Sequence, residues 1–166
     1  AVVHNGIIEN HESLRENLIK EGYVFESATD TEVIAHLLHH ELKTSSDLRD
    51  AMDRLLDQLE GAYAVAVIDE NHSGRVMAAR LGSPLVVGLG IGENYIASDP
   101  QALRPVTDRF IFLEEGELVE ITADEVSIFG HNKDVVESRA VTLDERHDGA
   151  DKGNYRHYMQ KEIFEQ

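Results

Sequence analysis

The sequence contains no cysteine. Disulfide bonds and thiolate metal ligands are therefore excluded within these residues. A cysteine nucleophile within these residues is excluded for the same reason. Zero cysteine also fits a reducing compartment, and the cytoplasm is the location that we expect.

Positive charge is scarce, because 15 Lys and Arg face 32 Asp and Glu and give a formal net charge of -17. A surface this negative repels phosphate groups, so we expect no nucleic-acid partner and no membrane partner. The chain also lacks an apolar run of the roughly 20 residues that a membrane-spanning helix needs. The hydrophobic share of 42% in 166 residues is instead enough for one compact domain with a real core.

An initiating methionine is absent as well, and the chain starts inside an apparent strand, Ala1-Val2-Val3. We therefore expect it to be a fragment of a longer protein.

The hydrophobic pattern predicts an α+β fold in which helices come first and antiparallel strands follow. Helices are expected over residues 10–21, 29–42 and 46–60, and Thr29 and Glu32 form a capping-box pattern at the start of the second helix. Strands are expected over residues 1–6, 23–25, 63–69, 76–80, 85–89, 95–98, 110–113, 118–121 and 126–129. Residues 144–154 have a linker composition, and a further helical pattern starts at residue 155.

Asn5-Gly6 ends the first expected strand without a return strand, although Asn-Gly between apolar runs is a strong hairpin signal. A side-chain amide next to a backbone N–H at a strand end is also how an oxyanion hole is built. Glycine there would allow a substrate to approach the backbone closely. From these residues alone, an ordinary turn stays the simpler interpretation.

Other candidate sites have simpler structural explanations. Asp30 could bind a cation, but a carboxylate in the first turn also stabilises a helix. A histidine cluster could bind a metal ion, but it lies largely off the apolar stripe and is simpler as a solvated face; its members are His36, His39 and His40. The glycines at positions 88, 90 and 92 resemble a phosphate loop, but the strand-like segment that follows favours a hairpin turn.

Longer blocks of sequence carry a more specific signal. They are "HNGIIENHESLRENL" (4–18), "SATDTEVIAHL" (27–37), "GAYAVAVID" (61–69) and "DKGNYRHYMQKEIFEQ" (151–166). These blocks resemble the glutaminase domain of the glucosamine-6-phosphate synthase family, which belongs to the class II glutamine amidotransferases. The resemblance covers nearly the whole chain.

The resemblance implies a partial N-terminal-nucleophile hydrolase fold, an αββα sandwich of antiparallel sheets that lacks its first strands. In this family an N-terminal cysteine, with its own amine as the base, attacks the side-chain amide of glutamine. Ammonia leaves and passes to a sugar-isomerase domain of the same chain, where fructose 6-phosphate becomes glucosamine 6-phosphate. No cofactor and no metal are implied.

By position, Asn5 and Gly6 match the catalytic oxyanion-hole pair, and Asp30 matches the carboxylate that holds the α-amino group of glutamine. The family's cysteine and the arginine-containing segment that binds the glutamine carboxylate precede residue 1. We therefore expect residues 1–143 to be the C-terminal part of the amidotransferase domain and residues 144–166 to be a linker and the start of a bridge. Residues 1–166 alone should be inactive, and strands left uncovered should favour a homo-oligomer.

Two alternatives remain open. The chain could belong to another class II amidotransferase, such as asparagine synthetase or the purine-pathway amidophosphoribosyltransferase, although residues 155–166 argue against this. It could also be a non-catalytic module that binds an amino acid, and the lack of cysteine supports that interpretation.

Overall fold

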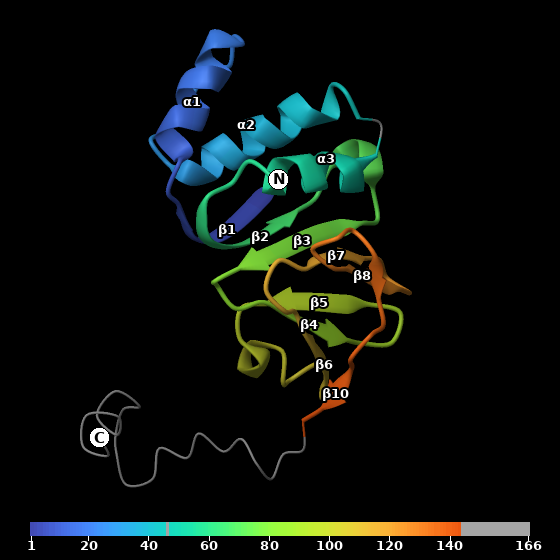
Figure 1. The fold of residues 1–166 in the computed structure, drawn as a ribbon. Coiled ribbons are helices and arrows are strands. Elements are labelled where there is room, and N and C mark those ends of the chain that lie inside the picture. Colours follow the sequence, from blue (N-terminus) through green and yellow to red (C-terminus); the bar gives the residue numbers. More distant parts are fainter. Residues whose placement is uncertain (46, 144–166) are drawn as a thin grey trace, which may run out of the picture.

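The computed structural model of the chain describes residues 1–45 and 47–143. Three helices, α1 (His11–Lys20), α2 (Asp30–Leu42) and α3 (Leu48–Leu56), form a layer on one face of an antiparallel sheet (Figure 1). That sheet has the strand order β1-β2-β3-β7-β8-β9, and a second antiparallel sheet has the order β10-β6-β4-β5. The predicted α+β fold with antiparallel sheets is confirmed.

The strands of the first sheet are β1 (Val2–Ile8), β2 (Gly61–Val67), β3 (Val76–Leu81), β7 (Leu118–Ile121), β8 (Val126–Phe129) and β9 (Val135–Val136). Those of the second sheet are β4 (Val86–Leu89), β5 (Asn94–Ala97), β6 (Arg109–Phe112) and β10 (Val141–Thr142). Short 3₁₀ helices occur at Glu70–His72 and at Pro100–Ala102. Within the described residues, no helix is both long and apolar enough to cross a membrane.

Two hydrophobic cores follow from the alternation of side chains along the strands. In β2, Tyr63, Val65 and Val67 pack toward the helices, whereas Ala64 and Ala66 face the second sheet. A third, smaller cluster lies on the other side of the second sheet and contains Val86, Leu103 and Phe110. In residues 1–45 and 47–143 that outer side carries the 3₁₀ segment and no α-helix.

The second sheet leaves part of the first sheet uncovered. The odd-numbered residues of β1 share a face with Ala64 and Ala66, because Asn5 pairs with Ala64 and Val3 pairs with Ala66. Val3 and Ile7 are nevertheless 69% and 66% exposed. Residues 1–45 and 47–143 therefore leave the face of β1 that points away from the helices open.

Several predicted elements differ from those observed. The segment 23–25 is not a strand, because Tyr23 and Phe25 are partly buried against the core under the helices and form no ladder. The third helix ends at Leu56 and not near residue 60, and the short strands β9 and β10 were not predicted. The predicted linker and bridge, residues 144–166, lie outside the described residues.

Candidate functional site

Asn5 and Gly6 lie inside β1 and not at its end, which corrects the prediction of a strand over residues 1–6. The pairing continues without interruption from Val2 to Ile8, with Gly6 opposite Tyr63. Gly6 has φ +113°, and a Cβ atom there would lie 2.1 Å from the carbonyl oxygen of Ala62. Only glycine fits this position without displacing β2.

The backbone hydrogen bonds of β1 show which of its N–H groups are free of the sheet. Ala1 and Ile68 exchange bonds of 2.7 and 3.0 Å, and the N–H of Glu9 donates to the carbonyl of Glu60 over 2.8 Å. The backbone N–H and C=O groups of the odd-numbered residues therefore point toward β2. Strand geometry points the N–H groups of the even-numbered residues away from β2. Among the described residues β1 is the last strand in its sheet, so the N–H groups of Gly6 and Ile8 point to an edge that no described strand pairs with.

Asp30 reaches this same edge from the helix layer. It is the first residue of α2, and its Oδ2 atom accepts a hydrogen bond of 3.0 Å from the N–H of Ile8. Burial alone would raise the pKa of Asp30, but the bond from Ile8 and the attraction of His4 bring it below the ordinary value of 3.8. The carboxylate is therefore ionised at neutral pH and can attract a cation.

The side chain of Asn5 lies on the opposite face of β1 from the helices. It lines a cavity of about 230 Å³ between the two sheets, together with Val3, Ala64, Val65, Ala66, Leu85, Ile96, Ala97 and Ser98. The cavity is mostly apolar, so the Asn5 amide is one of its few hydrogen-bonding groups. The structure thus puts Gly6 and Asp30 on one edge and the Asn5 amide beside that edge.

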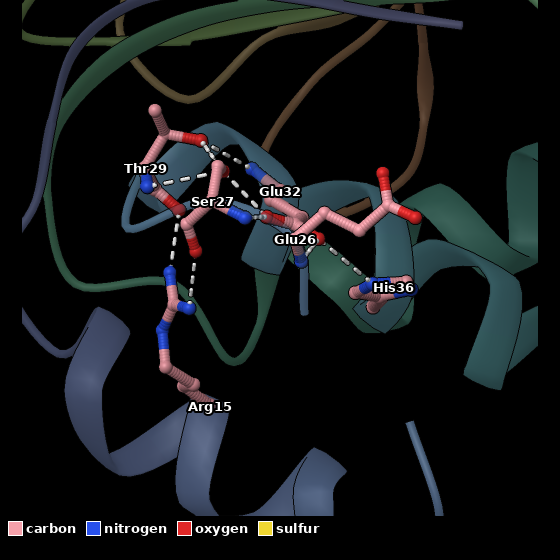
Figure 2. Close-up of polar contacts among 6 residues, drawn as sticks. All are labelled: Arg15, Glu26, Ser27, Thr29, Glu32 and His36. Carbon is pink, nitrogen blue, oxygen red and sulfur yellow. Dashed lines mark hydrogen bonds and ion pairs between the residues drawn. The ribbon is translucent and has the colours of Figure 1, made fainter. Parts of the chain in front are cut away.

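The loop that leads into α2 is organised by Glu32 (Figure 2). The hydroxyl of Thr29 accepts from the N–H of Glu32 over 3.3 Å, which confirms one half of the predicted capping box. The other half is wrong, because the Glu32 carboxylate accepts from the N–H groups of Glu26 and Ser27, each over 2.7 Å, and from the Ser27 hydroxyl. The carboxylate thus holds the preceding loop and not the cap residue itself.

Arg15 of α1 fixes the same loop from the other side (Figure 2). Its guanidinium donates to the carbonyl oxygens of Ser27 and Thr29 over 2.7 and 2.8 Å, and it stacks 4.4 Å from the ring centre of Phe25. Because Thr29 precedes Asp30, these contacts set the position at which α2 starts. The loop therefore places Asp30 against β1 without any strand pairing of its own.

The stability of the protein should depend on pH through the protonation of Glu32. Hydrogen bonds from Ser27 and Glu26 lower the pKa of Glu32 from 4.5 to about 2. A carboxyl whose pKa is lowered by folding stabilises the protein above its unfolded pKa, and this contribution is lost as the pH falls from about 4.5 toward 2. We expect the urea midpoint to fall less over this range in Glu32→Gln than in the original chain.

The matched control for this titration is Glu16→Gln, which removes the same charge from an exposed position of α1. Its urea midpoint should follow that of the original chain across the same pH range. Equal pH dependence in both variants would show that Glu32 does not carry the effect.

The histidine cluster lies around the Tyr23 ring. His39 Nδ1 is 2.9 Å from the Tyr23 hydroxyl, and His36 Nε2 is 3.5 Å from a Glu32 oxygen. In the part of the chain that the structure describes, no three His, Cys, Asp or Glu side chains are grouped to hold a metal ion. The cluster therefore packs the loop against α2.

The glycines near residue 90 form the predicted hairpin turn. Gly88 lies in β4, and the N–H of Gly90 donates to the carbonyl of Glu93 over 3.0 Å just before β5. A strand follows this turn where a dinucleotide site would need a helix.

Sequence reasoning missed His4, which contacts the start of α2. Its Nδ1 atom lies 3.2 Å from the Thr31 hydroxyl and 3.7 Å from Asp30 Oδ1. The sequence does indicate that His4 and Gly6 lie on the same side of one strand, because they occupy alternate positions. This pattern places His4 near Asp30 only once it is known that the start of α2 packs against that strand.

Comparison with known proteins adds to this geometry. Residues 1–105 match the family model of the glutamine amidotransferase domain. The glutamine–fructose-6-phosphate aminotransferase (isomerizing) of Vibrio vulnificus is 55% identical over 166 residues, which is 100% of this chain and 27% of that protein. The corresponding protein of Escherichia coli is 58% identical over 165 residues, or 99% of this chain and 27% of that protein.

Among solved structures, the glutamine phosphoribosylpyrophosphate amidotransferase of B. subtilis has a similar fold. Its TM-score is 0.66 at 29% sequence identity, over 81% of this chain and 30% of that chain. The present chain thus spans about a quarter of the length of the curated relatives.

Proposed function

We propose, because the chain belongs to the glutamine amidotransferase domain family, that it forms part of a glutaminase that releases ammonia from glutamine. Its similarity to glutamine–fructose-6-phosphate aminotransferases supports fructose 6-phosphate as the acceptor of that ammonia and glucosamine 6-phosphate as the product. The acceptor site would belong to a sugar-isomerase domain of the same longer chain. The proposal includes a cytoplasmic location.

The observation that carries the proposal is the open edge of β1. The N–H of Gly6 points outward there, and the Asp30 carboxylate is bonded to the N–H of Ile8, two residues further along. Two residues of a strand span about 7 Å. In glutamine, the amide carbon and the α-nitrogen are four bonds apart, so one molecule can reach both groups.

The roles follow from charge. Attack on the amide carbon creates an oxyanion, which the Gly6 N–H and the Asn5 amide would stabilise as donors that are already in place. The α-ammonium of glutamine is a cation, which the ionised Asp30 would bind. The three residues provide binding and electrostatic stabilisation, but none of them is a nucleophile.

The nucleophile is the missing part, because the chain contains no cysteine. We propose that an N-terminal cysteine outside residues 1–166 attacks the amide, with its own amine as the base. Residues 1–166 alone should release no measurable ammonia from glutamine. A longer protein in which the cysteine-bearing segment of a relative precedes residue 1 should release it. Glutamine binding by that longer protein without ammonia release would favour a non-catalytic binding module.

Replacement of Asp30 by alanine in the longer protein should mainly weaken glutamine binding. A charge-assisted hydrogen bond contributes about 1.5–3 kcal/mol, so KM should rise by about 10–150-fold. The turnover number should change little, because the ammonium is charged in the ground state and in the transition state alike. Steady-state ammonia release measures both constants.

Asp124→Ala is the control for Asp30→Ala, since Asp124 is an exposed carboxylate in a turn before β8. It removes the same charge and should leave KM unchanged. A fall in turnover without a change in KM in Asp30→Ala would contradict the proposed role in binding.

A further inference from the structure

We propose that His4 is a positioning residue that orients the Asp30 carboxylate toward the α-ammonium of the substrate. The inference rests on the proposed function and adds a residue to its binding site. Two contacts carry it: His4 Nδ1 lies 3.7 Å from Asp30 Oδ1 and 3.2 Å from the Thr31 hydroxyl.

The surroundings of His4 favour a proton on Nδ1. The side chain is only 2% exposed, and in the described residues its Nε2 atom is buried without a hydrogen-bond partner. Nδ1, in contrast, faces two oxygen atoms. A proton on Nδ1 therefore meets acceptors, and it places the positive end of the N–H dipole toward Asp30.

The two oxygens of Asp30 are then held by different groups of β1. Oδ2 accepts from the N–H of Ile8, and Oδ1 faces His4. The hydrogen bond from Ile8 fixes Oδ2, and the attraction of the His4 N–H favours the carboxylate orientation in which Oδ1 faces His4, so the remaining lone pairs keep a preferred direction. A carboxylate held in this way binds an ammonium group without first losing rotational freedom.

Packing alone does not account for a histidine at this position. A buried nitrogen without a partner is unfavourable, and an apolar side chain of similar volume would avoid that cost. His4→Leu should therefore fold. His4→Asn should keep the function, because the asparagine amide can place an N–H donor close to where Nδ1 lies.

The experiment uses the longer, cysteine-bearing protein and two amides. Glutamine has the α-amino group, and glutaramic acid has the same amide and carboxylate without it. His4→Leu should raise KM for glutamine by about tenfold, because the Asp30 carboxylate loses the polar contact that orients it, while kcat stays within about twofold. The kcat/KM for glutaramic acid should not change. His4→Asn should stay within about threefold of the original KM for glutamine.

A merely structural role would lower the activity on both amides to the same extent, and that result would overturn the inference. An unchanged KM for glutamine in His4→Leu would also overturn it, as would an equal loss in His4→Asn and His4→Leu. In an Asp30→Ala background, His4→Leu should have no further effect on KM, because its action passes through Asp30.

The same experiment distinguishes an error in the proposed function from an error in the role of His4. If the longer protein with His4 and Asp30 intact releases no ammonia from glutamine, the proposed function is wrong and the role of His4 falls with it. If that protein is active and His4→Leu behaves like it on both substrates, only the positioning role is wrong.

Discussion

Replacement of Asn5 by alanine in the longer, cysteine-bearing protein is expected to lower the turnover of glutamine by about 10²–10³-fold, the usual cost of one oxyanion donor. The Asn5 amide is one of the few polar groups that line the cavity between the sheets. A donor that β1 already holds in place needs no reorganisation when the oxyanion forms, whereas water does, so the loss of the donor has a large effect. KM should change far less than kcat, because the negative charge develops only during the reaction.

Val3→Ala is the matched control for Asn5→Ala. Val3 lines the same cavity and lies two residues away on the same face of β1. Its truncation removes apolar surface but no hydrogen-bond donor, so turnover should stay within about threefold. Near-normal turnover in Asn5→Ala would show that the Asn-Gly sequence serves only the backbone of β1.

Gly6→Ala is expected to lower the free energy of unfolding by about 2–5 kcal/mol. The first part is the left-handed backbone conformation, which costs an L-residue about 1–2 kcal/mol. The second part is the clash of the new Cβ with the Ala62 carbonyl oxygen at 2.1 Å, which forces β1 and β2 apart. Urea unfolding of residues 1–166 measures the sum.

Gly74 provides the control, since it has φ +80° and nothing within 4 Å of the position of a Cβ atom. Gly74→Ala should lower the free energy of unfolding by the conformational part alone, about 1–2 kcal/mol. The difference between the two variants isolates the clash with β2. Equal losses in both variants would mean that β2 moves away from the new Cβ atom with no loss of unfolding free energy.

Local patterns predicted most of the fold correctly. The apolar face of the second helix and the residue Thr29 before it placed α2, and turn residues separated the strands of both sheets. The prediction failed where a partner distant in sequence decides the outcome. Tyr23 and Phe25 look like a strand because both are apolar and aromatic, but they pack on a helix. Asn5-Gly6 looks like a turn because local chemistry cannot show that Tyr63 and Ala64 pair with it.

The candidate site, like the fold, could be predicted from the sequence only in part. Reasoning from the residues favoured helix-end chemistry for Asp30 and a turn for Gly6, and only the resemblance to a family gave them roles in binding and catalysis. Asp30 does lie in the first turn of α2, so its structural role and its proposed role coexist. The contact with Ile8 could not be predicted, since it depends on which backbone groups of β1 face away from β2.

The alternation along β1 has a consequence for the kinds of mutation that this segment tolerates. Even-numbered residues supply the His4 side chain and the outward N–H groups of Gly6 and Ile8, whereas odd-numbered residues supply the Asn5 side chain and the bonds to β2. A substitution changes only the group that one residue supplies. Insertion or deletion of a single residue shifts the strand by one position and exchanges the two sets completely. Between Val2 and Ile8, the insertion or deletion of one residue should therefore disrupt the structure and the site more than most single substitutions do.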